Sequence, residues 1–197
     1  MPHHTGNCSD ARDDVLGLLR GEHDRLLEEF REFDRLQSLQ ANQACQRVAQ
    51  RTFAALKVLA SVEQQLFYPA VHPAISDTDL IDQSQIEHAR IQRLVAKLEE
   101  AEPTQSTYRR CFRTLGEYVR RHVHDEEQEL FSILGRVTID WEQLYEKMTS
   151  RRAELAEDLG VAHVQIASEP AEFVDEEYDA YDEEHEEEEE LAIEVQH

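Results

Sequence analysis

Ionisable residues interrupt four stretches of this chain that are otherwise apolar at helical spacing. They are His23, Glu63, His88 and the pair His122 and Glu126. Residues three and four apart share one face of a helix, so each group stands where a helical bundle would place its core. A buried carboxylate without a counter-charge is costly, and such groups normally pair or bind metal. A single histidine of this kind is better interpreted as a core residue bonded to a carbonyl, but three imidazoles and two carboxylates together indicate a metal site.

The last pair has the spacing of two ligands to one ion. His122 and Glu126 are four residues apart, so they project from the same face of a helix about one turn apart. Imidazole with carboxylate suits iron, manganese or zinc, and two carboxylates can bridge a pair of metals. A ferritin-like di-iron site would need Glu-x-x-His on two helices. No glutamate stands three positions before any of the three histidines, which disfavours that family.

The elements that must position these residues are helices. The chain has 197 residues and 40% hydrophobic content, enough for one core, and long periodic segments with only six Gly and five Pro predict an all-α fold. The first helix is predicted over about residues 10–39, and the second follows it to about residue 68. Two further long helices are predicted over 78–102 and 104–134, and a shorter fifth helix over 140–159. Pro69 and Pro73 are expected to end the second helix. Short connections predict an antiparallel up-down-up-down four-helix bundle with the fifth helix against its end or side.

The acidity of the chain is concentrated at its C-terminal end. The net charge is −23, but residues 169–197 hold 15 Asp and Glu with no Lys or Arg, so the preceding residues carry only −8. We therefore expect two parts: residues 1–160 form the helical bundle, and residues 161–197 form an acidic, disordered tail. A solvated tail is favoured over an interaction arm, and a protein partner for it is unknown. The negative charge argues against nucleic-acid and anionic-membrane partners.

Cysteine usage and the N-terminal residues predict a cytoplasmic location. Cys8, Cys45 and Cys111 lie far apart without a CxxC pair, which excludes a zinc ribbon or dithiol motif, and an odd count fits a reducing compartment. Residues 1–12 lack the apolar core of a signal peptide. The sequence contains no apolar stretch long enough to span a bilayer.

The two halves of the predicted bundle look like copies of one helical hairpin. His23 and Glu63 are 40 positions apart, and His88 and Glu126 are 38 positions apart. The segment EQQLFYP beginning at Glu63 aligns with EEQELFS beginning at Glu126. Two hairpins related by an approximate two-fold axis would bring both glutamates to one central level.

With these residues in place, the chain resembles the hemerythrin-like HHE cation-binding family over about residues 10–155. The matching segments are GEHDRLL around His23, VEQQLFYP containing Glu63, EHARI around His88, and RRHVHDEEQELF containing His122 and Glu126. The resemblance implies non-haem iron in a four-helix bundle. It also implies that His88 and His122 hold one metal, and that both carboxylates bridge to a second metal beside His23.

One position departs from the family pattern. A further histidine would fall four residues before Glu63, where this chain has Leu59, so the second metal position is expected to be weaker, more open or empty. Water, Tyr68 and Glu22 are candidates to replace the missing imidazole, but helical phase places none of them at the level of Leu59. The polar neighbours Gln64, Glu127 and Asp24 are interpreted as supporting or solvent-facing groups.

The resemblance implies a di-iron or partly occupied iron centre that binds or reacts with O2, NO or peroxide. Whether the protein is an enzyme that decomposes peroxide or reacts with oxygen stays open at this stage. A second hypothesis is an iron- or redox-sensing module without turnover. A third is a degenerate, metal-free structural bundle, which the leucine at position 59 favours and the five polar core positions oppose.

Overall fold

The computed structural model describes residues 8–160, and the predicted tail over 161–197 lies outside them. The helices are α1 (Cys8–Ser38), α2 (Asn42–Val62), α3 (Tyr68–Val71), α4 (Asp79–Glu100), α5 (Ser106–Asp125), α6 (Phe131–Ile133) and α7 (Trp141–Asp158). Two π-helical turns (Glu63–Phe67 and Glu126–Leu130) and two 3₁₀ turns (His72–Ala74 and Leu134–Arg136) connect them. The described residues contain no strand, and the all-α prediction is confirmed.

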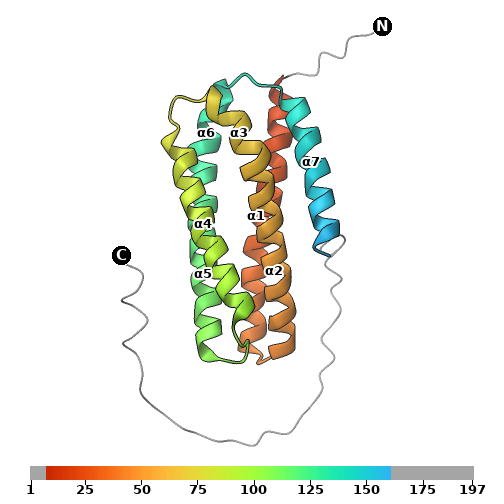
Figure 1. The fold of residues 1–197 in the computed structure, drawn as a ribbon, viewed down its shortest axis with the longest axis vertical. Coiled ribbons are helices and arrows are strands. Elements are labelled where there is room, and N and C mark those ends of the chain that lie inside the picture. Colours follow the sequence, from red (N-terminus) through yellow and green to blue (C-terminus); the bar gives the residue numbers. More distant parts are fainter. Residues whose placement is uncertain (1–7, 161–197) are drawn as a thin grey trace, which may run out of the picture. The chain divides into compact units, whose positions relative to one another are not determined.

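Four antiparallel rods form the bundle (Figure 1). The rods are α1, α2 continued by α3, α4, and α5 continued by α6. Within the bundle α1 packs against α2 and α5, and α4 packs against α5 and α2, as an up-down-up-down arrangement requires. The fifth long helix, α7, lies along one side against α1 and α2. The predicted bundle with an added helix is therefore confirmed.

The second and fourth rods each contain a widened turn at their glutamate. The N–H of Tyr68 donates to the carbonyl of Glu63, and the N–H of Phe131 donates to the carbonyl of Glu126, five residues earlier in both cases. Such π turns hold an extra residue and occur frequently at functional sites. The expectation that Pro69 ends the second helix is wrong, because helix continues to Val71. The proline lies in the first turn of α3, directly after the π turn, where a missing N–H is tolerated.

The ends of α7 lie close to the predicted bounds of 140 and 159, and each end has a capping residue. The Asp140 side chain accepts a hydrogen bond of 3.0 Å from the backbone N–H of Gln143. At the other end Gly160 has a φ of 68°, in the left-handed region that glycine enters without a steric cost. The helix therefore begins and ends where short-range chemistry dictates.

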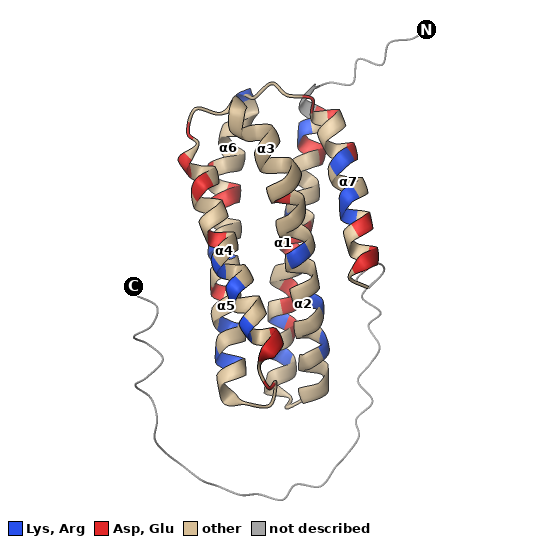
Figure 2. Cartoon of the chain, in the orientation of Figure 1, with Lys and Arg blue, Asp and Glu red and all other residues tan. Residues whose placement is uncertain are grey.

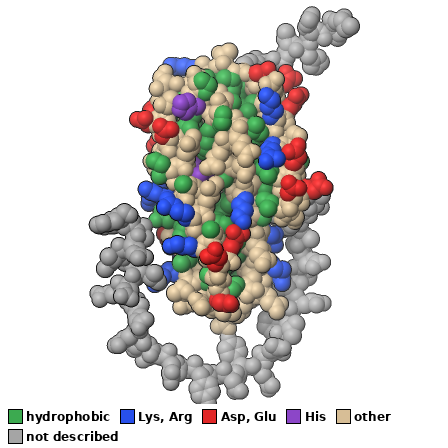
Figure 3. Space-filling view, in the orientation of Figure 1, with side chains coloured by type: hydrophobic (Ala, Val, Ile, Leu, Met, Phe, Trp, Pro, Cys, Tyr) green, Lys and Arg blue, Asp and Glu red, His purple; other side chains and the backbone are tan. Residues whose placement is uncertain are grey.

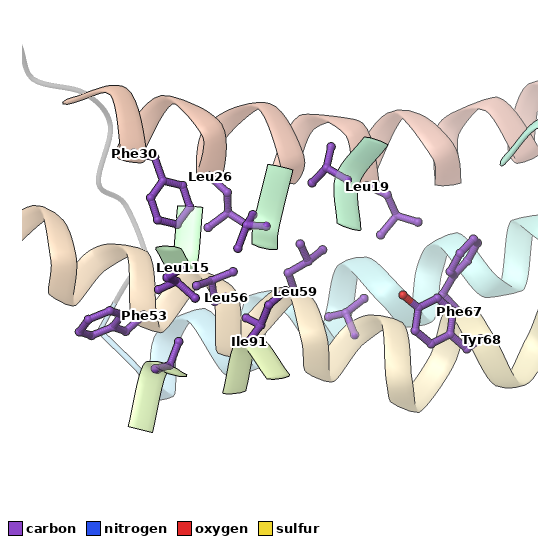
Figure 4. Close-up of a cluster of buried hydrophobic side chains, with 14 of the residues drawn as sticks. Leu19, Leu26, Phe30, Phe53, Leu56, Leu59, Phe67, Tyr68, Ile91 and Leu115 are labelled. Atoms are coloured by element: carbon purple, nitrogen blue, oxygen red, sulfur yellow. The ribbon is translucent and has the colours of Figure 1, made fainter. Parts of the chain in front are cut away.

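Apolar side chains fill the bundle on both sides of the level at which the ionisable residues lie. Near one end the rings of Phe30, Phe33 and Phe53 all contact that of Phe112, with Phe33 stacked at a centroid distance of 4.0 Å. Leu59 lies between the rods among further aliphatic side chains (Figure 4) and is only 6% exposed. The core thus holds the ionisable residues between two apolar regions.

Acidic and basic residues are spread along all the long helices (Figure 2). On the face seen in Figure 3, acidic and basic side chains are interspersed with small apolar areas. Of the helices that the structure describes, none has the length and apolar character needed to cross a membrane. Two of the three cysteines, Cys45 and Cys111, fall within the described side chains, and both are free thiols.

Candidate metal centre

All five candidate ligands are buried and come together between the rods. The exposed fractions are 1% for His23, 0% for Glu63, 3% for His88 and for His122, and 1% for Glu126. One side chain comes from each of α1, α4 and α5, and the two glutamates are the first residues of the two π turns. Each rod thus contributes at least one of the five groups to the interior.

Three of these residues form the first half of the centre. The Nε2 atoms of His88 and His122 are 2.9 Å apart, and His88 Nε2 is 3.2 Å from Glu63 Oε2. Metal ions hold nitrogen and oxygen donors at about 2.0–2.2 Å, which puts the donors of one ion about 3–4 Å from each other. This spacing suits one ion bound by two imidazoles and a carboxylate.

The second half of the centre contains one imidazole and two carboxylates. His23 Nε2 lies 3.5 Å from Glu63 Oε1 and 3.3 Å from Glu126 Oε2. Glu63 belongs to both halves, with one oxygen directed to each, so its carboxylate can bridge two ions. The donors of each half lie within 4.8 Å of one another.

Several polar atoms at this centre have no hydrogen-bond partner. They are His23 Nε2, His88 Nδ1 and both carboxylate oxygens of Glu63 and of Glu126. Buried polar atoms without partners are rare in folded proteins, because each costs about 1–3 kcal/mol. Except for His88 Nδ1 and Glu126 Oε1, these atoms belong to the contacts described above and converge on the centre. The donor set therefore fits a cation, which would satisfy these atoms together.

The two carboxylates beside His23 favour the protonated form of its imidazole. Burial by itself lowers the pKa of His23, but the contacts with Glu126 and Glu63 outweigh burial and raise this pKa to about 11. Burial likewise favours the neutral form of Glu63, yet His23 and His88 outweigh it and lower its pKa to about 2. The positive charge that a metal would supply is thus partly supplied by imidazolium in the metal-free protein.

Two carboxylates outside the centre bind the outer nitrogens of the histidines. Glu127 Oε1 accepts a hydrogen bond of 2.8 Å from His23 Nδ1, and Glu87 Oε2 accepts one of 3.1 Å from His122 Nδ1. Glu127 was interpreted from the sequence as a supporting or solvent-facing group, and its hydrogen bond to His23 is a supporting contact. Glu87 was missed in the sequence. The available signal was its place directly before His88, on the edge of the buried face.

Glu87 also reaches the surface between α4 and α5. It lies at a small pocket of about 100 Å³, lined by Gln83, Glu87, Arg90, Tyr118, Arg121 and Asp125. The Gln83 side chain donates a hydrogen bond of 2.9 Å to Glu87 Oε1. His122 is thus linked to this pocket through a single carboxylate.

The hydroxyl of Tyr68 also lies at the centre. It is 3.4 Å from His88 Nε2, in the half that contains His122, and the side chain is buried. Burial first, and then the charges of Glu126 and Glu63, raise the pKa of Tyr68 well above its usual value. The hydroxyl therefore stays protonated and can donate a hydrogen bond. Its proximity to His88 was not predicted, because the π turn before Tyr68 changes the helical phase.

The remaining histidines outside the chain ends are not at the centre. His72 and His124 are exposed, in agreement with their interpretation as turn and surface residues. Position 59 holds a leucine packed in the core, so the half with His23 has a single imidazole.

Comparisons with known proteins agree with this architecture. The family model for the hemerythrin HHE cation binding domain matches residues 14–134. A crystal structure from Mycobacterium kansasii, described as a hemerythrin HHE cation binding domain-containing protein, superposes with a TM-score of 0.60 at 19% sequence identity. The match covers 72% of this chain and 86% of that one, and at this identity it supports the fold alone. No curated protein matches the chain. The family model spans more than half of the sequence and includes all five candidate ligands, so the chain belongs to the hemerythrin HHE cation binding domain family.

Proposed function

We propose that this protein is a non-haem iron protein whose bundle holds a di-iron, or partly occupied, centre that binds or reacts with O2, NO or peroxide. The observation that carries the proposal is the set of buried imidazole and carboxylate atoms that face one another without hydrogen-bond partners. Bound cations would satisfy the buried atoms that lack partners and would also explain why the five ionisable side chains gather in the core. Imidazole with carboxylate is a donor set that suits iron.

In this proposal the five residues divide between two ions. His88 and His122 would hold one ion and His23 the other, with Glu63 and Glu126 as the proposed bridging carboxylates. In the structure Glu63 faces both groups of histidines, and Glu126 faces His23. Bound iron would supply a change of oxidation state and a coordination position open to a small molecule. Because Leu59 supplies no imidazole, the open position is expected on the ion beside His23.

The surrounding side chains shape the environment in which a small molecule would bind. The rings of Phe67 and Phe131 pack edge to face at 5.9 Å, and Phe131 stacks on the His23 imidazole at 6.2 Å. These buried rings exclude bulk water from one side of the centre. The protonated hydroxyl of Tyr68 can donate a hydrogen bond to a group bound in the half with His88.

Iron content and thermal unfolding test the proposal. The protein would be expressed with iron, freed of loosely bound metal, and assayed for iron per chain and for the ultraviolet charge-transfer bands of an oxo-bridged pair. Iron at 100 times its Kd is expected to stabilise the fold by about 2.7 kcal/mol. This raises Tm by roughly 5–11 °C for a chain of this size. Loss of most of the iron, with an unchanged Tm on adding it, would instead identify a metal-free structural bundle.

Peroxide turnover separates an enzyme from a binding or sensing module. Activity that His122→Ala abolishes would identify a catalytic centre, because that variant removes one of the two imidazoles from the half with His88. The matched control is His124→Ala, which removes an exposed histidine two residues away. Tight iron binding without turnover would identify a sensing module.

A further inference from the structure

Two imidazoles of the centre are backed by a carboxylate, and the third is not. Glu127 binds the outer nitrogen of His23 at 2.8 Å, and Glu87 binds that of His122 at 3.1 Å. In contrast, His88 Nδ1 is buried without any hydrogen-bond partner. An acceptor at the outer nitrogen fixes which nitrogen carries the proton, orients the ring and makes the inner nitrogen a better metal ligand.

The repeat of the two hairpins explains why His88 lacks support. Glu127 directly follows the centre's glutamate in the fourth rod, and the residue that follows Glu63 in the second rod is Gln64. By this symmetry the side chain at position 64 should face the His88 imidazole. Instead the Gln64 amide oxygen accepts a hydrogen bond of 3.4 Å from Gln92. At the position related to Glu127, this chain therefore has a neutral amide, and that amide bonds to Gln92.

The same symmetry identifies a fourth supporting position, Glu22. Here the carboxylate is present, but the imidazole that it would support is absent. Glu87 directly precedes His88, and Glu22 directly precedes His23. Glu87 binds His122, whose counterpart in the first hairpin is Leu59, so Glu22 has no imidazole to support. Arg152 of α7 binds the Glu22 carboxylate, and Arg25 lies 2.9 Å from the same oxygen. The carboxylate of Glu22 is therefore an ion-pair partner of two arginines.

We propose that Glu127 and Glu87 are positioning residues that orient His23 and His122 toward the metals, one for each half of the centre. Their carboxylates would hold the proton on Nδ1 and leave Nε2 free to bind. Because the two supports act on different ions, each half contains one imidazole of fixed orientation, and His88 is the weakly held ligand. This role presupposes the iron centre proposed above.

Ferrous iron, titrated anaerobically against a competing chelator, tests this role in the full-length protein. Glu127→Gln and Glu87→Gln are each expected to weaken iron binding about tenfold, as loss of such a partner typically does. Glu22→Gln is the matched control: it makes the same change at the related position, where Arg152 is the partner, and should leave iron affinity unchanged. Gln64→Glu is expected to strengthen binding several-fold, since it supplies the acceptor that His88 lacks.

A spectroscopic signature separates orientation from general stability. In the iron(II) protein each bound imidazole gives an exchangeable Nδ1–H proton resonance shifted by the metal. Glu127→Gln should move the resonance of His23 alone, and Glu87→Gln that of His122 alone. Wild-type affinity and unmoved resonances in both variants, or no gain from Gln64→Glu, would overturn the positioning role. Failure of the wild-type protein to bind iron would overturn the proposed function instead.

Discussion

Replacing Leu59 by histidine should restore the imidazole that the His23 half of the centre lacks. Position 59 lies four residues before Glu63, the separation between His122 and Glu126 in the related rod. Because α2 is a regular helix up to Val62, a side chain at 59 projects from the same face as Glu63. Leu59→His should therefore raise the amount of iron bound per chain.

Leu59→His should also lower the free energy of unfolding of the iron-free protein, because Leu59 is buried in the core. The leucine is 6% exposed, and burying such a side chain contributes about 1.5–3 kcal/mol. A buried imidazole without a full set of partners adds a penalty of about 1–3 kcal/mol. The combined loss of about 2.5–6 kcal/mol lowers Tm by roughly 5–24 °C. Iron should recover much of this loss, because the new imidazole then becomes a ligand.

The control is Leu56→His, which alters another leucine of α2 with the same exposed fraction of 6% but further from Glu63. Iron per chain and Tm, with and without iron, would be measured for both variants and the wild type. Both variants should lose stability without iron, and only Leu59→His should gain iron and recover. Equal iron content in all three proteins would refute the assignment of position 59 to the centre.

Three further outcomes are expected. Gly116→Ala should lower the free energy of unfolding in denaturant by about 1–3 kcal/mol, because the added Cβ would lie 2.9 Å from Phe30 Cδ1; an unchanged midpoint would contradict this. His23 keeps its proton at neutral pH in the iron-free protein, since its pKa is raised to about 11, and iron must displace that proton. Iron affinity should therefore fall as pH falls, with proton release visible by calorimetry in two buffers, and a pH-independent affinity would count against it. Deleting residues 169–197 should leave iron content unchanged, because all five candidate ligands precede them; a large loss would show that the tail contributes.

The fold and the convergence of the five side chains followed from patterns within single helices. Apolar residues at a spacing of three and four predicted the long rods, and the polar interruptions predicted which side chains would meet inside. The predicted bounds of the fifth helix, 140–159, agree with α7, because the caps at Asp140 and Gly160 depend on neighbouring residues alone. Such local signals can be read from the sequence without coordinates.

The π turns could not be read in this way. Their extra residue shifts the helical phase, so a helical wheel of regular period through Glu63 places Tyr68 on the wrong face. The continuation of the helix past Pro69 was missed as well, because the π turn directly before it was not predicted. The contact between Glu87 and His122 joins two rods, and no spacing within one helix reports it. Contacts between helices depend on packing, which the sequence pattern leaves undetermined.

The widened turns have a consequence for engineering this centre into other proteins. Each turn rotates the part of its rod beyond the glutamate relative to the part before it, so the two parts present different faces to their neighbours. The five ligands placed on uniformly wound helices would lack this rotation, and Phe67 and Leu130 would no longer reach the interior. A working graft must therefore carry over EQQLF and EEQEL as complete five-residue blocks along with the coordinating side chains.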